Sequence, residues 1–136
     1  MTYLLDTNAC VAVLNTRPAA VRDHYQAREG AGHTIVTSTI VTYELWYGVS
    51  KSKRKDKNAQ VLSALLSQIS VLPFTDDDGQ AASVIRAELE SSGQPIGPYD
   101  VLIAGQAVSR EAVLVTANVR EFSRVANLLW EDWACP

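Results

Sequence analysis

The first hydrophobic stretch of the chain ends in a carboxylate. Residues 3–5 form an unbroken apolar run, Asp6 follows at once, and an apolar helical pattern resumes at residues 10–14. A strand that is apolar on both faces belongs in the middle of a covered parallel sheet. We therefore predict a core strand over residues 2–5, with Asp6 at its carboxyl end, followed by a helix that Asn8 caps.

Segments with strand character alternate with segments of helical periodicity along the rest of the chain. Further strands are predicted over residues 33–37, 70–72 and 112–116 and near residues 128–130. Helices are predicted over residues 19–28, 40–50, 58–69, 76–91 and 100–110. This alternation is typical of an α/β fold, here a three-layer α/β/α arrangement around a parallel sheet of about five strands. The length suits one domain, residues 1–136.

Composition and charge argue against a membrane protein but decide little else. Apolar residues make up 47% of the chain, and no apolar run reaches the ~20 residues needed to span a bilayer. The amino-terminal run lacks a basic leader and is broken by Asp6, so we expect no signal peptide and a cytoplasmic location. The net charge is −3, but the remaining surface would sum to +1 if four acids lined one pocket. Bulk charge therefore does not exclude a nucleic-acid partner.

Three carboxylates occupy positions that are unusual for an acid. Asp6 ends the first core strand, Glu44 has apolar neighbours on its predicted helix, and Asp100 opens a helix after a Gly-Pro turn. The carboxyl ends of parallel strands and the amino ends of the following helices meet at one edge of a sheet. We therefore expect Asp6 and Asp100 to converge. The fourth strand brings either Asn118 or Glu121 to the same edge.

A shared pocket of carboxylates indicates a divalent cation. Carboxylates held together repel each other and raise one another's pKa values. A hard cation with oxygen ligands, Mg²⁺ or Mn²⁺, removes that penalty and can activate water for phosphodiester cleavage. Each acid also has a purely structural interpretation: Asp6 as a helix cap, Glu44 as a side chain that reaches solvent, and Asp100 as an acid of a first helical turn. Their joint occurrence favours the metal site.

Five short segments of the chain form a set of sequence motifs in a fixed order. They are residues 4–8 (LLDTN), 42–48 (TYELWYG), 97–105 (GPYDVLIAG), 115–122 (VTANVREF) and 131–133 (EDW). In this order and spacing they resemble a PIN domain, and specifically the VapC toxins of type II toxin–antitoxin systems. The resemblance covers nearly the whole chain and implies a PIN-like fold with five parallel strands. It also implies a Mg²⁺-dependent endoribonuclease, a VapB-type antitoxin that blocks its site, and a homodimer.

The resemblance also implies roles for individual residues. Asp6, Glu44 and Asp100 match the three core acids of the family, and Asp6 and Asp100 would be the main metal ligands. Thr7 and Thr116 match small hydroxyl positions that orient ligands or water.

The fourth acidic position departs from the family's pattern. This chain has Ala117-Asn118 where relatives often show Asn-Asn or Asn-Asp. The acid that fits is Glu121, with Asn118 as a neutral helper. The overall pattern is most similar to VapC toxins that cut the anticodon stem-loop of initiator tRNA, and that substrate rests on resemblance alone.

Three alternatives to this interpretation differ in what they require. A haloacid-dehalogenase-type phosphatase needs a second Asp two residues after Asp6, where this chain has Asn8. A receiver domain needs a Lys after a late core strand, and none follows Thr116. A catalytically silent PIN-fold module that binds RNA or protein stays open, although Asp6, Glu44 and Asp100 count against it.

Three further features are interpreted first in structural terms. The basic segment, residues 51–57 with five Lys or Arg, is either a solvated face or an RNA contact. Trp46, Tyr47 and Tyr99 are interpreted as core aromatics, with stacking on bases or on an antitoxin as the alternative. The acids of residues 76–78 are assigned to a helix amino terminus, outside the site.

Overall fold

The centre of the molecule is a parallel sheet with the first strand in its middle. A computed structural model describes residues 1–135; Pro136, the last residue of the predicted domain, lies outside the described residues. The strand order is β3-β2-β1-β4-β5, and every neighbouring pair is parallel. The strands are β1 (Thr2–Leu5), β2 (Thr34–Ser38), β3 (Ser70–Leu72), β4 (Val113–Val115) and β5 (Leu129–Glu131). The apolar run of β1 is buried, as its sequence predicts.

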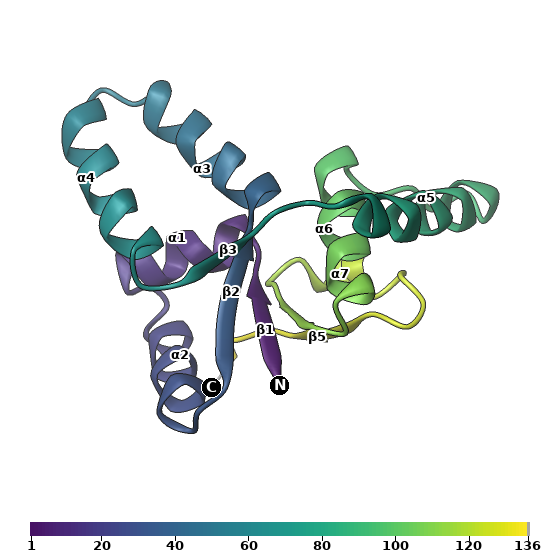
Figure 1. Cartoon of the computed structure of the whole chain (residues 1–136), viewed down its shortest axis with the longest axis horizontal. Helices are drawn as coiled ribbons and strands as arrows, with labels where there is room; N and C mark the ends of the chain where they lie inside the picture. Colours follow the sequence, from purple (N-terminus) through teal and green to yellow (C-terminus); the bar gives the residue numbers. More distant parts are fainter. Residues whose placement is uncertain (136) are drawn as a thin grey trace.

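Helices flank the sheet in the predicted three-layer α/β/α arrangement (Figure 1). In residues 1–135 they are α1 (Thr7–Asn15), α2 (Ala19–Gly30), α3 (Thr39–Ser50), α4 (Lys55–Leu66), α5 (Asp76–Ser91), α6 (Pro98–Ser109) and α7 (Val119–Phe122). The pairs α3–α4 and α5–α6 extend to opposite sides of the sheet in Figure 1. Among the helices of the described chain, none is long and apolar enough to cross a membrane.

The first helix begins at Thr7, two residues earlier than a cap at Asn8 predicts, because a different side chain caps it. Asn8 lies inside α1, so its assignment as the cap is wrong. The Oδ1 atom of Asp6 instead accepts a hydrogen bond from the Ala9 N–H at 2.8 Å. A carboxylate is as good an N-cap as an amide, so sequence alone does not choose between them. Asp6 therefore ends β1 and caps α1 at once.

Helix α4 lies three residues closer to the amino terminus than predicted, over Lys55–Leu66 instead of residues 58–69. Its first turn carries charged residues of the basic segment, which give no apolar signal. Helix α5 matches its prediction, residues 76–91, and Thr75 and Asp78 form a capping box at its amino terminus.

The aromatic residues near the site are not part of the core. Tyr47 is 59% exposed, Tyr99 43% and Trp46 38%, so their interpretation as core aromatics is wrong. Helical periodicity marks a continuous apolar stripe, but it does not tell which part of the stripe other elements cover. The largest fully buried side chains are Trp133, Phe122, Leu4, Leu5, Ile103 and Leu114.

Helices α5 and α6 pack closely at a glycine. A Cβ atom built on Gly105 of α6 would lie 2.5 Å from the Ala82 Cβ and 2.6 Å from the Ala82 Cα on α5. Those distances are far inside van der Waals contact, so the two helix backbones approach this closely only because residue 105 lacks a side chain. The contact fixes the position of α6, which carries Asp100 in its first turn.

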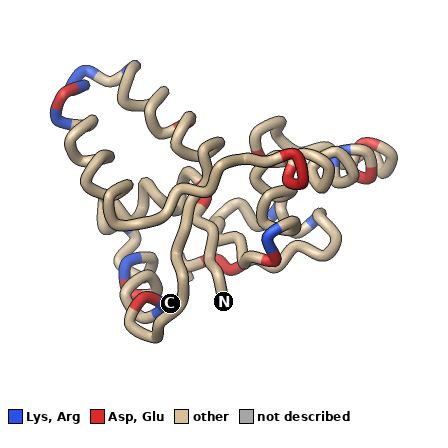
Figure 2. Tube along the Cα trace, viewed as in Figure 1, with Lys and Arg blue, Asp and Glu red and all other residues tan. Residues whose placement is uncertain are grey.

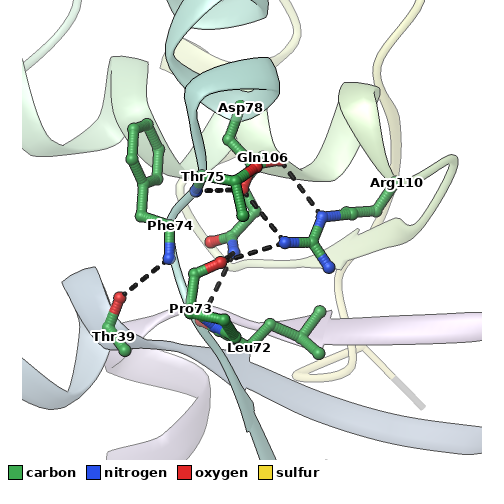
Figure 3. A network of polar contacts seen from close by, with 8 residues as sticks. All are labelled: Thr39, Leu72, Pro73, Phe74, Thr75, Asp78, Gln106 and Arg110. Carbon is green, nitrogen blue, oxygen red and sulfur yellow. Dashed lines mark hydrogen bonds and ion pairs between the residues drawn. The ribbon is translucent and has the colours of Figure 1, made fainter.

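A buried ion pair joins the same two helices (Figure 3). The Asp78 carboxylate accepts hydrogen bonds from Arg110 Nε at 3.1 Å and Nη2 at 3.2 Å, and from the Thr75 N–H at 2.9 Å. Arg110 Nη2 also donates to the Pro73 carbonyl at 2.9 Å, and Gln106 Nε2 donates to it at 3.2 Å. Burial on its own would raise the pKa of Asp78, but the hydrogen bonds led by Arg110 outweigh it and lower that pKa. Asp78 thus has a structural role outside the predicted site.

Replacing Asp78 with Asn should lower the free energy of unfolding at neutral pH by about 2 kcal/mol, because the partly buried Arg110 loses its countercharge. The folded-state pKa is lowered, so this stabilisation is present above the ordinary value of 3.8 and is lost as the pH falls through the folded-state value. Urea denaturation of wild type and Asp78→Asn at neutral pH, and again well below 3.8, measures the difference. The difference should shrink in acid.

The matched control is Glu90→Gln, which breaks the exposed Arg86–Glu90 pair of α5. An exposed pair contributes little, so this change should stay within about 0.5 kcal/mol. Equal losses in the two variants, or a difference for Asp78→Asn that does not depend on pH, would contradict the assigned role of Asp78.

Candidate metal centre

Four carboxylates from four elements lie around the carboxyl edge of the sheet. Asp6 follows β1, Glu44 lies on α3, Asp100 lies in the first turn of α6, and Glu121 lies on α7 after β4. Asp6 is 6% exposed, and the other three are partly buried. The site is therefore built from positions far apart in sequence that the parallel topology brings to one edge.

Asp6 is the most deeply buried of the four. Its backbone N–H donates to the Val115 carbonyl at 3.1 Å, which ties the start of α1 to the end of β4. Burial raises the pKa of its carboxyl group, the hydrogen bonds from Thr116 and the Ala9 N–H lower it, and the negative charge of Glu44 raises it again. The balance is a raised pKa. The surroundings of Asp6 therefore make its ionised form less favourable than it would be in water.

Asp100 shows the electrostatic coupling of the group most clearly. Burial is the main cause that raises its pKa, and a hydrogen bond with Glu121 is the next. The negative charges of Glu121, Asp6 and Glu44 add to these effects and bring the pKa of Asp100 to about 7. Charges from three other elements therefore act on Asp100, so the structure brings these four acids together as one electrostatic group.

Neutral side chains orient two of the acids. Thr7 Oγ1 donates to Glu44 Oε1 at 2.8 Å, which joins α1 to α3. Asn118 Nδ2 donates to Glu121 Oε2 at 2.9 Å, and the Asn118 N–H donates to Thr116 Oγ1 at 2.9 Å. The family resemblance implies Glu121 as the fourth acid and Asn118 as its neutral helper. In the structure the Asn118 amide lies beside Glu121 and holds its carboxylate.

Within residues 1–135, no Lys or Arg side chain forms an ion pair with any of the four acids. The ion pairs in the described part of the chain are Arg28–Glu131, Arg86–Glu90 and Arg110–Asp78. None of them includes a member of the group. Carboxylate oxygens without a protein cation have the donor chemistry that Mg²⁺ or Mn²⁺ prefers, so the residues fit a hard divalent cation.

The acids do not form a ready-made ligand shell. Among residues 1–135, no group of three or more His, Cys, Asp or Glu side chains is close enough to hold a metal ion. Like charges favour separated side-chain rotamers, and only Asp6 is fixed by a backbone donor at short range. We therefore expect the side chains of Glu44, Asp100 and Glu121 to move inward when a cation binds.

Sequence reasoning missed Asp132. It follows β5, and the register pairs Val115 of β4 with Glu131, so Asp132 arrives at the same edge as Thr116. Its charge contributes to the raised pKa of Asp6. The available signal was the one that identified Asp6, an acid directly after a strand, but β5 is too short and too exposed to be a strong strand prediction.

A cavity of about 380 Å³ opens beside the acids, between α1, α3 and α4. Thr7 and Glu44 lie on its wall, and the rest of the lining is mainly apolar, including Val11, Leu14 and Val61. A hydrophobic segment of a partner that filled this cavity would contact Glu44 directly.

The chain is similar to one protein family and to several known proteins over nearly its whole length. The family model described as the PIN domain matches residues 3–128. The chain is 39% identical over 132 residues to the tRNA(fMet)-specific endonuclease VapC of Shigella flexneri, across 97% of this chain and 98% of that protein. It is 41% identical over 133 residues to Ribonuclease VapC2 of Rickettsia felis, across 98% of each.

Solved structures give the same result for the fold. VapBC2 from Rickettsia felis, bound to a DNA fragment from its promoter, matches with a TM-score of 0.92 and 40% identity over 98% of this chain and 99% of that one. DNA-bound VapBC from Salmonella typhimurium matches with a TM-score of 0.90 and 36% identity over 98% of each chain.

Removing one charge from the group should stabilise the metal-free protein. At mildly alkaline pH in chelator, Asp100→Asn should raise the free energy of unfolding by about 1 kcal/mol, because the variant relieves repulsion among buried carboxylates. Added Mn²⁺ should stabilise wild type by mass action and stabilise the variant less. Thermal or urea denaturation with and without Mn²⁺ measures both effects.

The control for this experiment is Glu88→Gln, which removes the same charge from an exposed position of α5. It should leave both the stability and the effect of Mn²⁺ unchanged. If Asp100→Asn behaves like this control, the acids do not act as one group.

Proposed function

The chain belongs to the PIN domain family, among its VapC members, and from that premise we propose that it is a divalent-metal-dependent endoribonuclease that acts as the toxin of a type II toxin–antitoxin pair. The observation that carries this proposal is the group of Asp6, Glu44, Asp100 and Glu121 without a protein cation. Such a group costs stability, and a hydrolytic metal site is the function that explains the cost.

Asp6 and Asp100 would hold the cation, with Mg²⁺ as the proposed ion and Mn²⁺ as a substitute. The Ala9 N–H fixes the Asp6 carboxylate through Oδ1. A bound Mg²⁺ supplies Lewis-acid stabilisation of the charge that develops on the phosphate during cleavage. The raised pKa values of Asp6 and Asp100 belong to groups that need a positive partner to stay ionised.

The remaining residues accept the proton of the attacking water and orient the metal-binding carboxylates. Glu44 is oriented by the Thr7 hydroxyl and accepts the proton of the attacking water. Glu121, held by Asn118, shares a hydrogen bond with Asp100 and keeps that side chain aligned. Water attacks the phosphorus, the bond from phosphorus to the 3′ oxygen breaks, and the 3′ oxygen takes up a proton from solvent. The products are therefore a 5′-phosphate and a 3′-hydroxyl, with no part for the RNA 2′-hydroxyl.

The substrate and the partner follow from the relatives. The Shigella flexneri relative is named a tRNA(fMet)-specific endonuclease, and we extend that substrate to this chain. The anticodon stem-loop of initiator tRNA is the cleaved segment that the family resemblance implies. Similar solved structures are VapBC complexes, so a VapB-type antitoxin and a homodimer complete the proposal. The apolar cavity beside Glu44 suits an antitoxin segment that would block the site. An enzyme that cleaves tRNA would act in the cytoplasm, which is the location we propose.

Asp6→Asn and Asp100→Asn should each lower the rate of RNA cleavage at least about 100-fold, because each removes a ligand charge. Asn at position 6 can still accept the Ala9 N–H, so the substitution separates the site role of Asp6 from its cap role. The measurement is cleavage-site mapping on total tRNA with Mg²⁺ and with chelator. Chelator should abolish cleavage by wild type.

The exposed variant Glu88→Gln serves again as the control and should cleave like wild type. Full activity of either Asn variant would end the metal-site proposal. RNA binding by wild type without any Mg²⁺-dependent cleavage would instead identify a catalytically silent module of the same fold.

A further inference from the structure

Two exposed tyrosines contact each other beside the acids. Tyr43 lies on α3 and Tyr99 on α6, and they are 55% and 43% exposed. Their ring centroids are 5.6 Å apart, the ring planes are inclined by 54°, and the hydroxyl oxygens are 3.5 Å apart. The pair therefore connects the two helices that carry Glu44 and Asp100.

The position of the pair relative to the site follows from the sequence. Tyr43 directly precedes Glu44, and Tyr99 directly precedes Asp100. The backbone of each tyrosine is therefore adjacent to an acid of the group, and both rings are exposed outside the core.

The surroundings of the pair favour a nucleic acid as the ligand. Tyr47 lies one helical turn after Tyr43 on α3, is 59% exposed, and carries Lys51 Nζ 4.9 Å above its ring centroid. The exposed basic segment continues from there to the tip of the α3–α4 hairpin, where Figure 2 shows Lys and Arg gathered. A path of aromatic rings that ends in positive charge matches a chain of flat bases joined by phosphates.

We propose that Tyr43 and Tyr99 form a stacking platform for an unpaired base next to the scissile phosphate. The inference rests on the proposed ribonuclease function and assigns two residues that hold the substrate. Bases inside a duplex are stacked on their neighbours and cannot reach a protein ring, whereas loop bases can turn outward. The phosphates on one side of that base follow α3 toward the basic segment.

The test compares substitutions that keep or remove the ring. Tyr43→Phe and Tyr99→Phe keep the stacking face and lose the hydroxyl, whereas Tyr43→Leu and Tyr99→Leu keep an apolar side chain without a ring. The substrate is a hairpin RNA cleaved in its loop, with 2-aminopurine at each loop position in turn. Binding is measured by fluorescence quenching in an Asp6→Asn background, where cleavage does not interfere.

The expected result separates the two sets of variants. One loop position should be quenched by the protein with native tyrosines and by the Phe variants, and the quenching should be lost with Leu. Each Leu variant should weaken hairpin binding roughly ten-fold. In the cleaving protein, KM should rise by the same factor with little change in kcat. Trp130→Leu, which removes an exposed aromatic from β5, should change none of these quantities.

Three results would overturn the platform. In the first, the Leu variants bind and cleave like the Phe variants. In the second, a fully paired RNA is cleaved as well as the hairpin. In the third, the Leu variants would lose self-association or antitoxin binding while RNA affinity stays unchanged, which would make the pair a protein interface. Because quenching is read without cleavage, the platform can fail while the proposed ribonuclease stands, and the ribonuclease can fail while the platform stands.

Discussion

Repulsion among carboxylates at one edge of the sheet opposes folding, so contacts elsewhere in the structure must offset it. Asp6 is buried, and negative charges from α3 and from the segment after β5 act on it. Asp100 receives the charges of three further acids. A fold can keep such a group only if its elements are held in place by contacts elsewhere, because the group itself opposes assembly.

The contacts that hold these elements lie away from the acids. Helix α6 is fixed against α5 by the close approach at Gly105 and by the Asp78–Arg110 pair. Helix α1 is fixed by the Asp6 cap and by the bond from the Asp6 N–H to β4. Neutral donors then orient the acids that remain movable: Thr7 holds Glu44, and Asn118 holds Glu121. The elements that carry the acids are thus held by contacts away from the site, and neutral hydrogen bonds orient two of the carboxylates.

The sequence predicts the parts of this arrangement that leave a local pattern. The apolar run before Asp6 predicts the central strand, and the alternation of strands and helices predicts which edge of the sheet collects the acids. Long-range pairings leave no such pattern. Asp78 was assigned only to a helix terminus because its partner, Arg110, lies 32 residues away. Tyr47 and Tyr99 were assigned to the core because periodicity does not show which apolar stripe stays uncovered.

Diffraction from crystals that contain Mn²⁺ is the sharpest check that the four acids form a metal site, because anomalous scattering locates the ion without reference to activity. We expect an anomalous peak roughly 2.1 Å from carboxylate oxygens of both Asp6 and Asp100, with Glu44 and Glu121 turned toward it. If the peak contacts neither Asp6 nor Asp100, or if no peak appears at this edge at saturating Mn²⁺, the four acids are not a metal site.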